Sequence, residues 1–502
     1  MSEWRCWYGY YRGIHTLDDL LSRAETRIDT WRSFLNTAID RVPSDIWSTK
    51  TMIGDPLHYM GNLLQDATQK GGSLPLYVVI DQYEVLPELN PTHGTTLQRV
   101  VNTLIKARDP VVFYRIGART YDWGKELRVW GAESRIELQR DYVVVDLSDA
   151  LMRNENTARS TFSDLATDVA VKRLEDAGYA ARVQDLTVLF GPESPEEEAR
   201  SYIPGKPTSR SVFLDAVPEE YIADIGRLCG ADASPLDLRL ASAWVLQRLG
   251  RGDRSSRIRD ELRARPWRRT WWRKERILAA LCQIASLVHA KKHYWGWTTV
   301  IDLSGANIAA FLLLASEVWD VATKFGHEPI GINGRPNAIP REIQSDGIRA
   351  ASTKWVTRDR LETTGGSHRY AILSRLGPAI HDAVIGDRAL SNPGHTGFSL
   401  REVDIQRDCS VQEFLRNGVS WAILEERAHT SKNPQDSARR KYYLHPLLSP
   451  TFEIPHKRVK EPLYITYEQA VTWFTTNNQI RFTGIKVHRT REAAERQSRL
   501  PF

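Results

Sequence analysis

The stretch LYVVIDQYEVL, residues 76–86, decides the fold of this chain. Its run of apolar, mostly β-branched residues before Asp81 is typical of a fully buried strand in a parallel sheet. Asp81 follows the run directly, and Glu84 comes three residues later. Because open α/β sheets bind ligands at the carboxyl ends of their strands, we expect both carboxylates at a ligand-binding edge.

Two interpretations of these carboxylates stay open at this point. In the first, Asp81 helps to hold Mg²⁺, as the acidic residue of a P-loop nucleotide hydrolase does, and Glu84 polarises a water for attack on a γ-phosphate. In the second, they are acidic residues that end a buried strand, as in many α/β proteins. The pattern alone does not separate the two interpretations.

Two further apolar runs extend the predicted sheet. VVFYRIG (111–117) delivers Arg119, and YVVVDL (142–147) is a third predicted strand, with a helix expected around Leu97–Lys106. Strand–helix–strand alternation predicts right-handed crossovers and a parallel sheet. At a strand end beside the acidic strand, Arg119 can sense or stabilise phosphate charge. The alternative is an arginine that caps the strand or pairs with Asp122.

The composition is that of a soluble globular protein with several domains. The 502 residues are 41% hydrophobic and 26% charged, which predicts about two to four domains. No apolar run is long enough to span a bilayer and the start has no signal-peptide layout, so we expect a cytoplasmic protein without membrane contact. Four scattered cysteines argue against a disulfide framework or a zinc site. The net charge of +6 permits a polyanionic partner.

The densest basic and aromatic cluster is RARPWRRTWWRKER, residues 263–276. Interleaved arginine and tryptophan can bind phosphates and stack on bases. Its candidate nucleic-acid contacts are Arg268, Arg269, Arg273 and Lys274. The alternative is an amphipathic helix whose tryptophans lie in the core and whose arginines face solvent.

Helix-start signals appear at two places in the middle of the chain. Ser194-Pro195 is a plausible cap and first residue of a helix. In IDLSGANIAAFLLL (301–314), between two long apolar helices, Ser304 is the predicted N-cap, with Gly305 and Asn307 easing the start of the helix.

Residues 368–455 have the layout of a winged helix. The pattern predicts a helix, a short strand and two short helices, then two strands around the polar loop HTSKNPQDSARR (429–440), which would be the wing. The predicted segments are, in order, 370–385, 391–402, 411–418, 421–427 and 441–444.

The predicted wing is basic. Lys432, Arg439, Arg440 and Lys441 would touch phosphates, and the helix at 411–418 would face a groove of DNA. That helix carries one cation, so base readout is expected to be poor. Because winged helices also serve as protein–protein modules, a role in packing or protein contact stays open.

Taken together, these pieces resemble a bacterial family, the AAA+-like P-loop ATPases of origin-recognition-complex type, close to the signal-transducing STAND ATPases. The resemblance covers most of the chain and rests on GYYRGIHT (9–16), LYVVIDQYEVL (76–86), FYRIGARTYDW (113–123), RDYVVVDL (140–147), LSGANIAAFLLLASEVWD (303–320), SNPGHTGFSL (391–400) and HTSK…KYYLHPLLSP (429–450).

The resemblance implies an α/β fold with three named parts and a tail. They are a parallel-sheet P-loop NTPase-like core (1–150), a helical lid and insert region (151–365), a winged-helix domain (366–455) and a C-terminal tail (456–502). ATP and Mg²⁺ are the implied cofactors. DNA, a protein partner or further copies of the chain are the implied partners. Some related ATPases act in defence against phage.

The same resemblance assigns roles to residues. Asp81 and Glu84 match the Walker B segment, with Asp81 on Mg²⁺. Arg119 lies just after the sensor-1-like strand. The helix that begins near Ser304 and Asn307 matches the lid segment that packs over the nucleotide.

One family motif is missing from the printed sequence, the G-x-x-x-x-G-K-[ST] loop that cradles phosphates with backbone N–H groups, a lysine and a hydroxyl. In the family this loop would precede GYYRGIHT, so we expect the sheet to lack its first strand. A start recorded too late, a degenerate ATPase and a separate chain that completes the site all explain this. We expect these residues alone to bind ATP weakly and to hydrolyse little of it. The alternative function is a non-catalytic protein that binds nucleic acid or protein.

Overall fold

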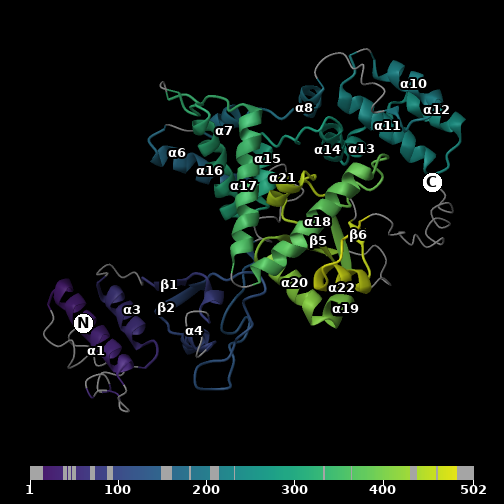
Figure 1. Cartoon of the computed structure of the whole chain (residues 1–502). Coiled ribbons are helices and arrows are strands. Elements are labelled where there is room, and N and C mark those ends of the chain that lie inside the picture. The colour runs from purple at the N-terminus through teal and green to yellow at the C-terminus, as the bar shows by residue number, and fades with distance from the viewer. Residues whose placement is uncertain are drawn as a thin grey trace. The chain divides into compact units, whose positions relative to one another are not determined.

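The computed structural model describes most of the chain. The described residues are 15–37, 42, 44, 47, 52–67, 74–87, 94–147, 161–179, 182–203, 214–230, 232–331, 334–362, 365–429, 438–459 and 462–482. Most of GYYRGIHT, Lys432 and most of the predicted wing lie outside them. The chain forms two compact units, Met1–Val145 and Asp146–Phe502, each of which is described by itself (Figure 1). No helix in the described ranges is both long and apolar enough to cross a membrane.

The first unit is built on one β–α–β repeat. Strand β1 pairs in parallel with β2, from Leu76 opposite Val112 to Ile80 opposite Ile116, and α4 connects them. This confirms the predicted strand–helix–strand alternation. The elements of the unit are α1 (Leu17–Asn36), α3 (Asp55–Ala67), β1 (Leu76–Ile80), the 3-10 turn η1 (Tyr83–Val85), α4 (Thr96–Ala107) and β2 (Val112–Ile116).

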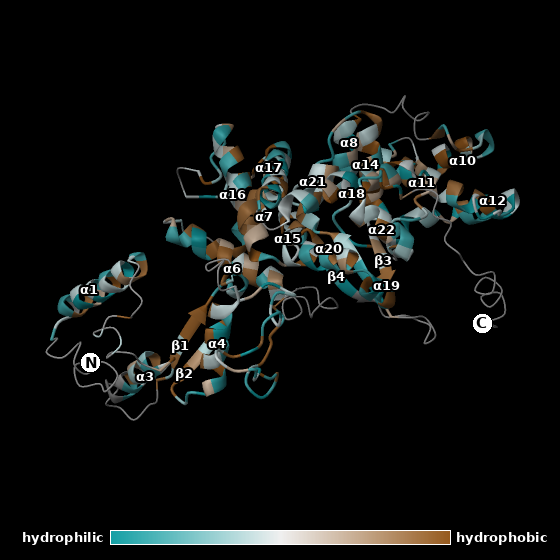
Figure 2. Cartoon of the chain, turned by 60° about the horizontal axis from the view of Figure 1, so that its bottom comes forward, coloured by the Kyte–Doolittle hydropathy of each residue, from teal (hydrophilic) through white to brown (hydrophobic). Residues whose placement is uncertain are grey.

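Two expectations about this sheet are wrong. Residues 143–146 form no strand, although Tyr142 makes an isolated bridge to Leu138. β1 is not fully buried either, since Tyr77 and Val79 are 49% and 71% exposed. β1 is apolar along most of its length (Figure 2), but among the described strands it has one neighbour, β2. A run of valines indicates that a segment favours a β-strand, but it does not indicate how many neighbouring elements will cover that strand.

The second unit begins with a helical region. Its apolar helix faces share a core that includes Trp244, Leu281 and Leu314. The helices are α6 (Thr161–Asp176), α7 (Val183–Phe190), α8 (Pro195–Tyr202), α10 (Glu219–Cys229), α11 (Pro235–Leu249), α12 (Ser255–Arg263), η2 (Pro266–Arg268), α13 (Thr270–Arg273), α14 (Ile277–Leu287), α15 (Trp297–Ser304), α16 (Ile308–Lys324) and α17 (Arg341–Leu361).

A four-stranded sheet with flanking helices follows the helical region. Its strand order is β4-β5-β3-β6, with β5 antiparallel to both β4 and β3. The order of elements is the predicted one of helix, strand, two helices and two strands. They are α18 (Gly366–Gly386), β3 (Gly397–Arg401), α19 (Glu402–Arg407), α20 (Cys409–Ser420), β4 (Leu424–His429), β5 (Arg439–Leu444), η3 (Pro446–Leu448), α21 (Ser449–Phe452), β6 (Leu463–Tyr464) and α22 (Tyr467–Thr475).

The last elements complete this sheet and its core. β6 pairs in parallel with β3. Phe474 of α22 stacks on Phe414 of α20, with ring centroids 4.7 Å apart. Residues in the predicted tail therefore pack on the sheet that the predicted winged helix contains.

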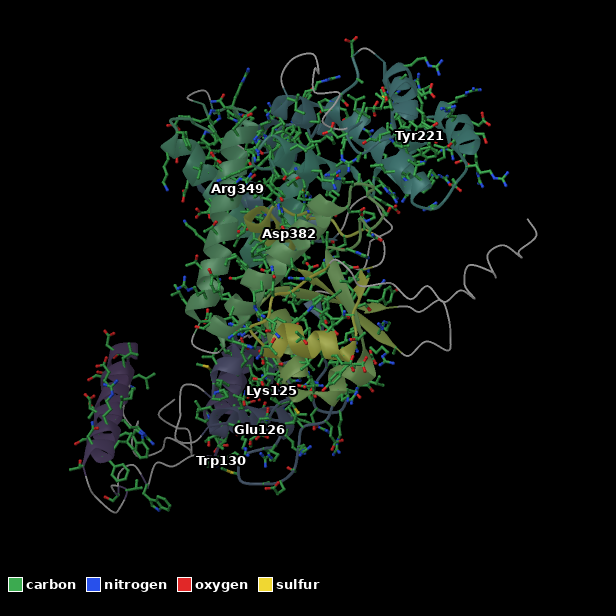
Figure 3. All side chains as sticks on the ribbon, turned by 45° about the vertical axis from the view of Figure 1, so that its right-hand side comes forward. Lys125, Glu126, Trp130, Tyr221, Arg349 and Asp382 are labelled. Atoms are coloured by element: carbon green, nitrogen blue, oxygen red, sulfur yellow. The ribbon has the colours of Figure 1, made fainter. Side chains whose placement is uncertain are left out.

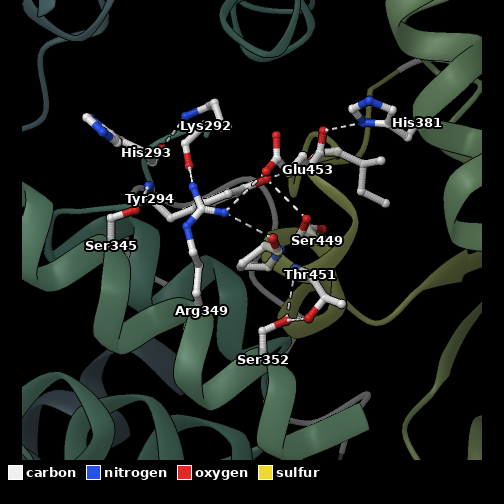
Figure 4. A network of polar contacts seen from close by, with 12 residues as sticks. Lys292, His293, Tyr294, Ser345, Arg349, Ser352, His381, Ser449, Thr451 and Glu453 are labelled. Carbon is white, nitrogen blue, oxygen red and sulfur yellow. Dashed lines mark hydrogen bonds and ion pairs between the residues drawn. The ribbon is translucent and has the colours of Figure 1, made fainter. Parts of the chain in front are cut away.

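A buried polar network joins the helical region to the segment after β5 (Figure 4). The Tyr294 hydroxyl donates to the carbonyls of Ser449 and Ile454, at 3.1 and 2.8 Å. Arg349 of α17 donates to the carbonyl of Pro450 at 3.4 Å. Because Tyr294 is 1% exposed, these bonds are shielded from water. The helical region and the sheet form one hydrophobic core.

Candidate functional site

The carboxyl ends of β1 and β2 bring Asp81 and Gly117 into contact. The Gly117 N–H donates to the carbonyl of Ile80 at 2.8 Å, which extends the strand pairing by one residue. A Cβ at position 117 would come within 2.8 Å of Asp81 Oδ1. Glycine is therefore needed here to leave room for the carboxylate.

Asp81 is exposed at this edge. Its Oδ1 accepts a hydrogen bond from the main-chain N–H of Gln82 at 2.9 Å. Mg²⁺ is commonly held by one or two carboxylates together with substrate phosphates and water. The position and chemistry of Asp81 fit that pattern, with Asp81 as a single protein ligand. No group of three or more His, Cys, Asp or Glu side chains gathers as metal ligands in the described ranges.

Glu84 and Arg119 meet at the same edge. Arg119 Nε lies 3.2 Å from Glu84 Oε1, and the main-chain N–H of Arg119 donates to Oε2 at 3.4 Å. The Glu84 side chain is 11% exposed and the Arg119 side chain is 29% exposed. Glu84 is thus the observed carboxylate partner of Arg119. Asp122, the partner named in the alternative, forms an ion pair with Lys125.

A buried tyrosine positions the turn that carries these groups. Gln82 has a left-handed backbone, with φ of 56°, and this reverses the chain after β1. Tyr83 is 1% exposed and its hydroxyl donates to Asn102 Oδ1 of α4 at 2.9 Å. Burial raises the pKa of Tyr83 to about 12. The anchored ring fixes the start of η1 and with it the position of Glu84.

Glu126, which is labelled in Figure 3, is a buried carboxylate of the first unit that no sequence motif signals. It is 5% exposed and binds the guanidinium groups of Arg128 and Arg99, at 2.9 and 3.0 Å. The hydrogen bond from Arg128 is the main cause that lowers the pKa of Glu126 to about 2. Its backbone carbonyl accepts from Asn102 at 3.0 Å. Glu126 therefore braces the helix that holds Tyr83.

Of the two predicted lid residues, Asn307 lies at the start of a helix as expected and Ser304 does not. Ser304 is the last residue of α15, fully buried, and its hydroxyl donates to the carbonyl of Ile301 at 2.5 Å. The prediction that Ser304 is an N-cap is wrong, because Gly305 ends α15 with a left-handed backbone. Asn307 is the N-cap of α16 and accepts from the N–H groups of Ala309 and Ala310. Contact of either residue with a nucleotide stays a prediction.

The arginine–tryptophan cluster is divided between core and surface. Trp267 and Trp272 are 0% and 3% exposed, which agrees with the alternative in which the tryptophans lie in the core. Trp271 does not agree with it, since it is 58% exposed. Arg268 pairs with Asp237, and Arg273 pairs with Asp237 and Glu196. Arg269 and Lys274 are exposed.

The basic residues of β5 lie on opposite faces of the sheet. Arg440 pairs with Glu402 at 2.7 Å and with Glu426 at 2.9 Å. Arg439 and Lys441 point to the other face, because side chains alternate along a strand. Lys441 lies opposite Arg427 in the β4–β5 pairing, so the cations of the two strands gather on that face.

The structure therefore brings together three of the predicted site residues, Asp81, Glu84 and Arg119. The other predicted positions belong to the second unit, apart from Lys432, which lies outside the described residues. Gly117, Tyr83 and Glu126 are the supporting residues that the sequence did not single out. A glycine directly after an apolar run was the one available signal among them.

The ORC-CDC6-like family model matches residues 10–465, which is most of the chain. The chain belongs to the ORC-CDC6-like family. This membership identifies an AAA+ ATPase lineage with a P-loop NTPase α/β fold, whose members generally bind ATP with Mg²⁺ and act in oligomers or with DNA. No curated protein and no solved structure matches the chain.

Proposed function

We propose that this ORC-CDC6-like protein is a nucleotide-controlled switch of the ATPase type. Asp81 holds the Mg²⁺ of an ATP complex, Glu84 orients the attacking water and Arg119 responds to phosphate charge. The observation that carries the proposal is that these three residues all follow the carboxyl ends of two paired parallel strands, with Glu84 and Arg119 in contact. Nucleotide-binding α/β sheets hold their ligands at that edge.

The Glu84–Arg119 pair is the resting position of the switch. While it is paired with the guanidinium group of Arg119, the Glu84 carboxylate is not free to accept a hydrogen bond from an attacking water. Phosphate oxygens compete with Glu84 for the same guanidinium group. When Arg119 turns to a phosphate, Glu84 is released to accept a proton from water. A ligand that favours one pairing over the other shifts the population of the two states.

The proposed output is a winged helix formed by residues 366–455, completed by β6 and α22. DNA phosphates bind the cationic face of β4 and β5 that carries Arg427, Arg439 and Lys441. α20 faces a groove and contributes little base readout. The close relation to STAND ATPases, a bacterial origin and a role in defence against phage are further parts of the proposal, and they rest on the sequence resemblance.

A non-catalytic binding protein is the second candidate. The Glu84–Arg119 ion pair, which engages both side chains, favours that candidate. In it the β1–β2 sheet is a scaffold and Glu84–Arg119 is a structural ion pair. DNA or protein binding then does not depend on nucleotide.

Magnesium-dependent ATP binding by the purified chain separates the candidates. The switch predicts weak binding that Asp81→Ala abolishes and Glu84→Gln retains. Glu137→Gln is the control, because Glu137 is a half-exposed carboxylate paired with Arg140 in the same unit. ATP binding that is unchanged by removal of Mg²⁺ and by all three substitutions supports the non-catalytic candidate. Strong magnesium-dependent turnover that Asp81→Ala abolishes overturns the expectation that these residues alone bind ATP weakly.

A further inference from the structure

A cavity of about 390 Å³ opens in the second unit between α11, α12 and the segment of η2 and α13. It lies within the size range of pockets that bind small molecules. Its lining holds four arginines and three tryptophans, but one carboxylate, Glu261. Such a lining favours an anionic ligand with a planar ring.

Two of the four arginines are parts of the cavity wall. Arg276 is 1% exposed and donates to the carbonyls of Leu390 and Trp272, each at 3.0 Å. Arg248 pairs with Glu261 at 2.8 Å and with Asp253 at 3.3 Å. These contacts fix the wall and leave little of either guanidinium group for a ligand.

The other two arginines, Arg251 and Arg269, are exposed at the cavity. Neither forms an ion pair with a carboxylate of the described residues. Arg276 is paired with Glu275 at 2.9 Å, and Arg248 is paired with Glu261 as described above. Arg251 and Arg269 are therefore the two lining arginines whose guanidinium groups are left for an anion to bind.

Trp271 supplies the aromatic surface. It is 58% exposed, whereas its neighbour Trp272 is 3% exposed and donates through Nε1 to Gln247 at 3.3 Å. Folding has thus buried one of two adjacent tryptophans and left the other at the mouth of a basic cavity. An exposed indole beside arginines is suited to stacking on a base.

We infer that this cavity is a nucleotide site, separate from the Asp81 site, that binds a nucleoside monophosphate. The base stacks on Trp271, and the phosphate binds Arg251 and Arg269. Since no carboxylate beyond Glu261 lines the cavity, and Glu261 pairs with Arg248, binding needs no Mg²⁺. This inference does not rest on the proposed ATPase function.

Fluorescence anisotropy with fluorescently labelled AMP and the full chain, in EDTA, tests the inference. We expect saturable binding that weakens about tenfold or more in the double variant Arg251→Ala, Arg269→Ala, and about tenfold in Trp271→Ala. Trp271→Phe retains a ring and restores binding to within about threefold. Unlabelled AMP competes better than adenosine or inorganic phosphate, since each of these offers half of the contacts.

Two controls keep the result specific. Arg254→Ala removes an exposed arginine that does not line the cavity, and it leaves binding unchanged. Asp81→Ala leaves binding unchanged as well, which separates this site from the first unit. If a 5′-phosphorylated oligonucleotide competes better than AMP and the same variants weaken its binding, the bound nucleotide is the 5′ end of a strand. This outcome also supports the site. Absence of binding at millimolar AMP, equal losses in Arg254→Ala, or loss in Asp81→Ala alone overturns the inference.

Discussion

The guanidinium group of Arg119 and the carboxylate of Glu84 form an ion pair across the ends of two parallel strands, with Nε and Oε1 3.2 Å apart. The residues are 35 positions apart in the sequence. Both side chains are mostly buried. The pair is therefore less screened by water than an exposed ion pair.

A double-mutant cycle measures this pair. We expect Arg119→Ala to lower the free energy of unfolding of the first unit by about 1–2 kcal/mol, because it leaves Glu84 uncompensated. With Glu84→Gln, the coupling energy is expected to be about 1 kcal/mol. Hydrogen exchange of the β1 and β2 amides measures the free energy of unfolding of each variant, and the coupling energy is calculated from these values. The exposed Arg140–Glu137 pair is the control, and an equal coupling in both cycles would contradict the prediction.

Gly117→Ala tests the contact between the two strand ends. The new methyl group would lie 2.8 Å from Asp81 Oδ1, so the carboxylate or the backbone must shift. We expect a loss of about 1–3 kcal/mol in stability of the first unit and weaker magnesium-dependent nucleotide binding. Gly386→Ala is the matched control, since no heavy atom lies within 4 Å of its added Cβ. An unchanged affinity for Mg²⁺-ATP in Gly117→Ala would argue against a role for Asp81.

Glu126 predicts acid sensitivity of the first unit. The hydrogen bond from Arg128 lowers the pKa of Glu126 to about 2, from an ordinary value of 4.5. The stability from this carboxylate is complete above pH 4.5 and is lost as the pH falls toward 2. After allowance for solvent screening, we expect about 1–2 kcal/mol. Glu126→Gln should remove that pH dependence in urea titrations between pH 5 and pH 2, and an unchanged profile would refute the assignment.

Arg439 and Lys441 should act on DNA binding, and Arg440 on stability. Replacing Arg439 and Lys441 by alanine is expected to reduce the slope of log affinity against log salt by about 2. Arg440→Ala should leave the slope unchanged and cost about 1–3 kcal/mol of stability, because Glu426 is 12% exposed and loses its ion pair with Arg440. DNA titrations at several salt concentrations measure the first effect and urea unfolding the second. Equal slopes for all the variants would remove this face from the proposed interface.

His445 predicts loss of stability in mild acid. It is 2% exposed, and burial lowers its pKa from 6.5 to about 4. The unfolded chain binds the proton first, so stability is lost as the pH falls from 6.5 toward 4, by about 1.4 kcal/mol per pH unit. His445→Asn should flatten this part of the stability profile of the second unit. An equal slope in the variant would show that other groups cause it.

The elements with strong local signals were predictable from the sequence. Thr96–Ala107 and Ile308–Lys324 are helices as expected. Ser194 caps α8 with Pro195 at its first position. Capping and periodicity act over a few residues, so one segment contains the whole signal. The expected strand at 142–147 failed because pairing depends on distant neighbours.

The candidate site was predictable in part for the same reason. Asp81, Glu84 and Arg119 follow apolar runs, and parallel strands place such residues at one edge. The close approach of Gly117 to Asp81 and the charge cluster at Glu126 depend on packing between segments far apart in the sequence. The split of the 263–276 cluster into buried Trp267 and exposed Trp271 depends on turns that periodicity alone does not define.

Tyr294 and Arg349 make the sheet of the second unit inseparable from the helices before it. Leu447 and Leu448 of η3 are fully buried, with α15 and α17 against them. A polypeptide cut at residue 366 would present these leucines and the carbonyls of Ser449 and Ile454 to water. Excised as a fragment, the part of the chain that begins at residue 366 would aggregate instead of folding. Limited proteolysis of the intact protein should accordingly release the two regions as one piece.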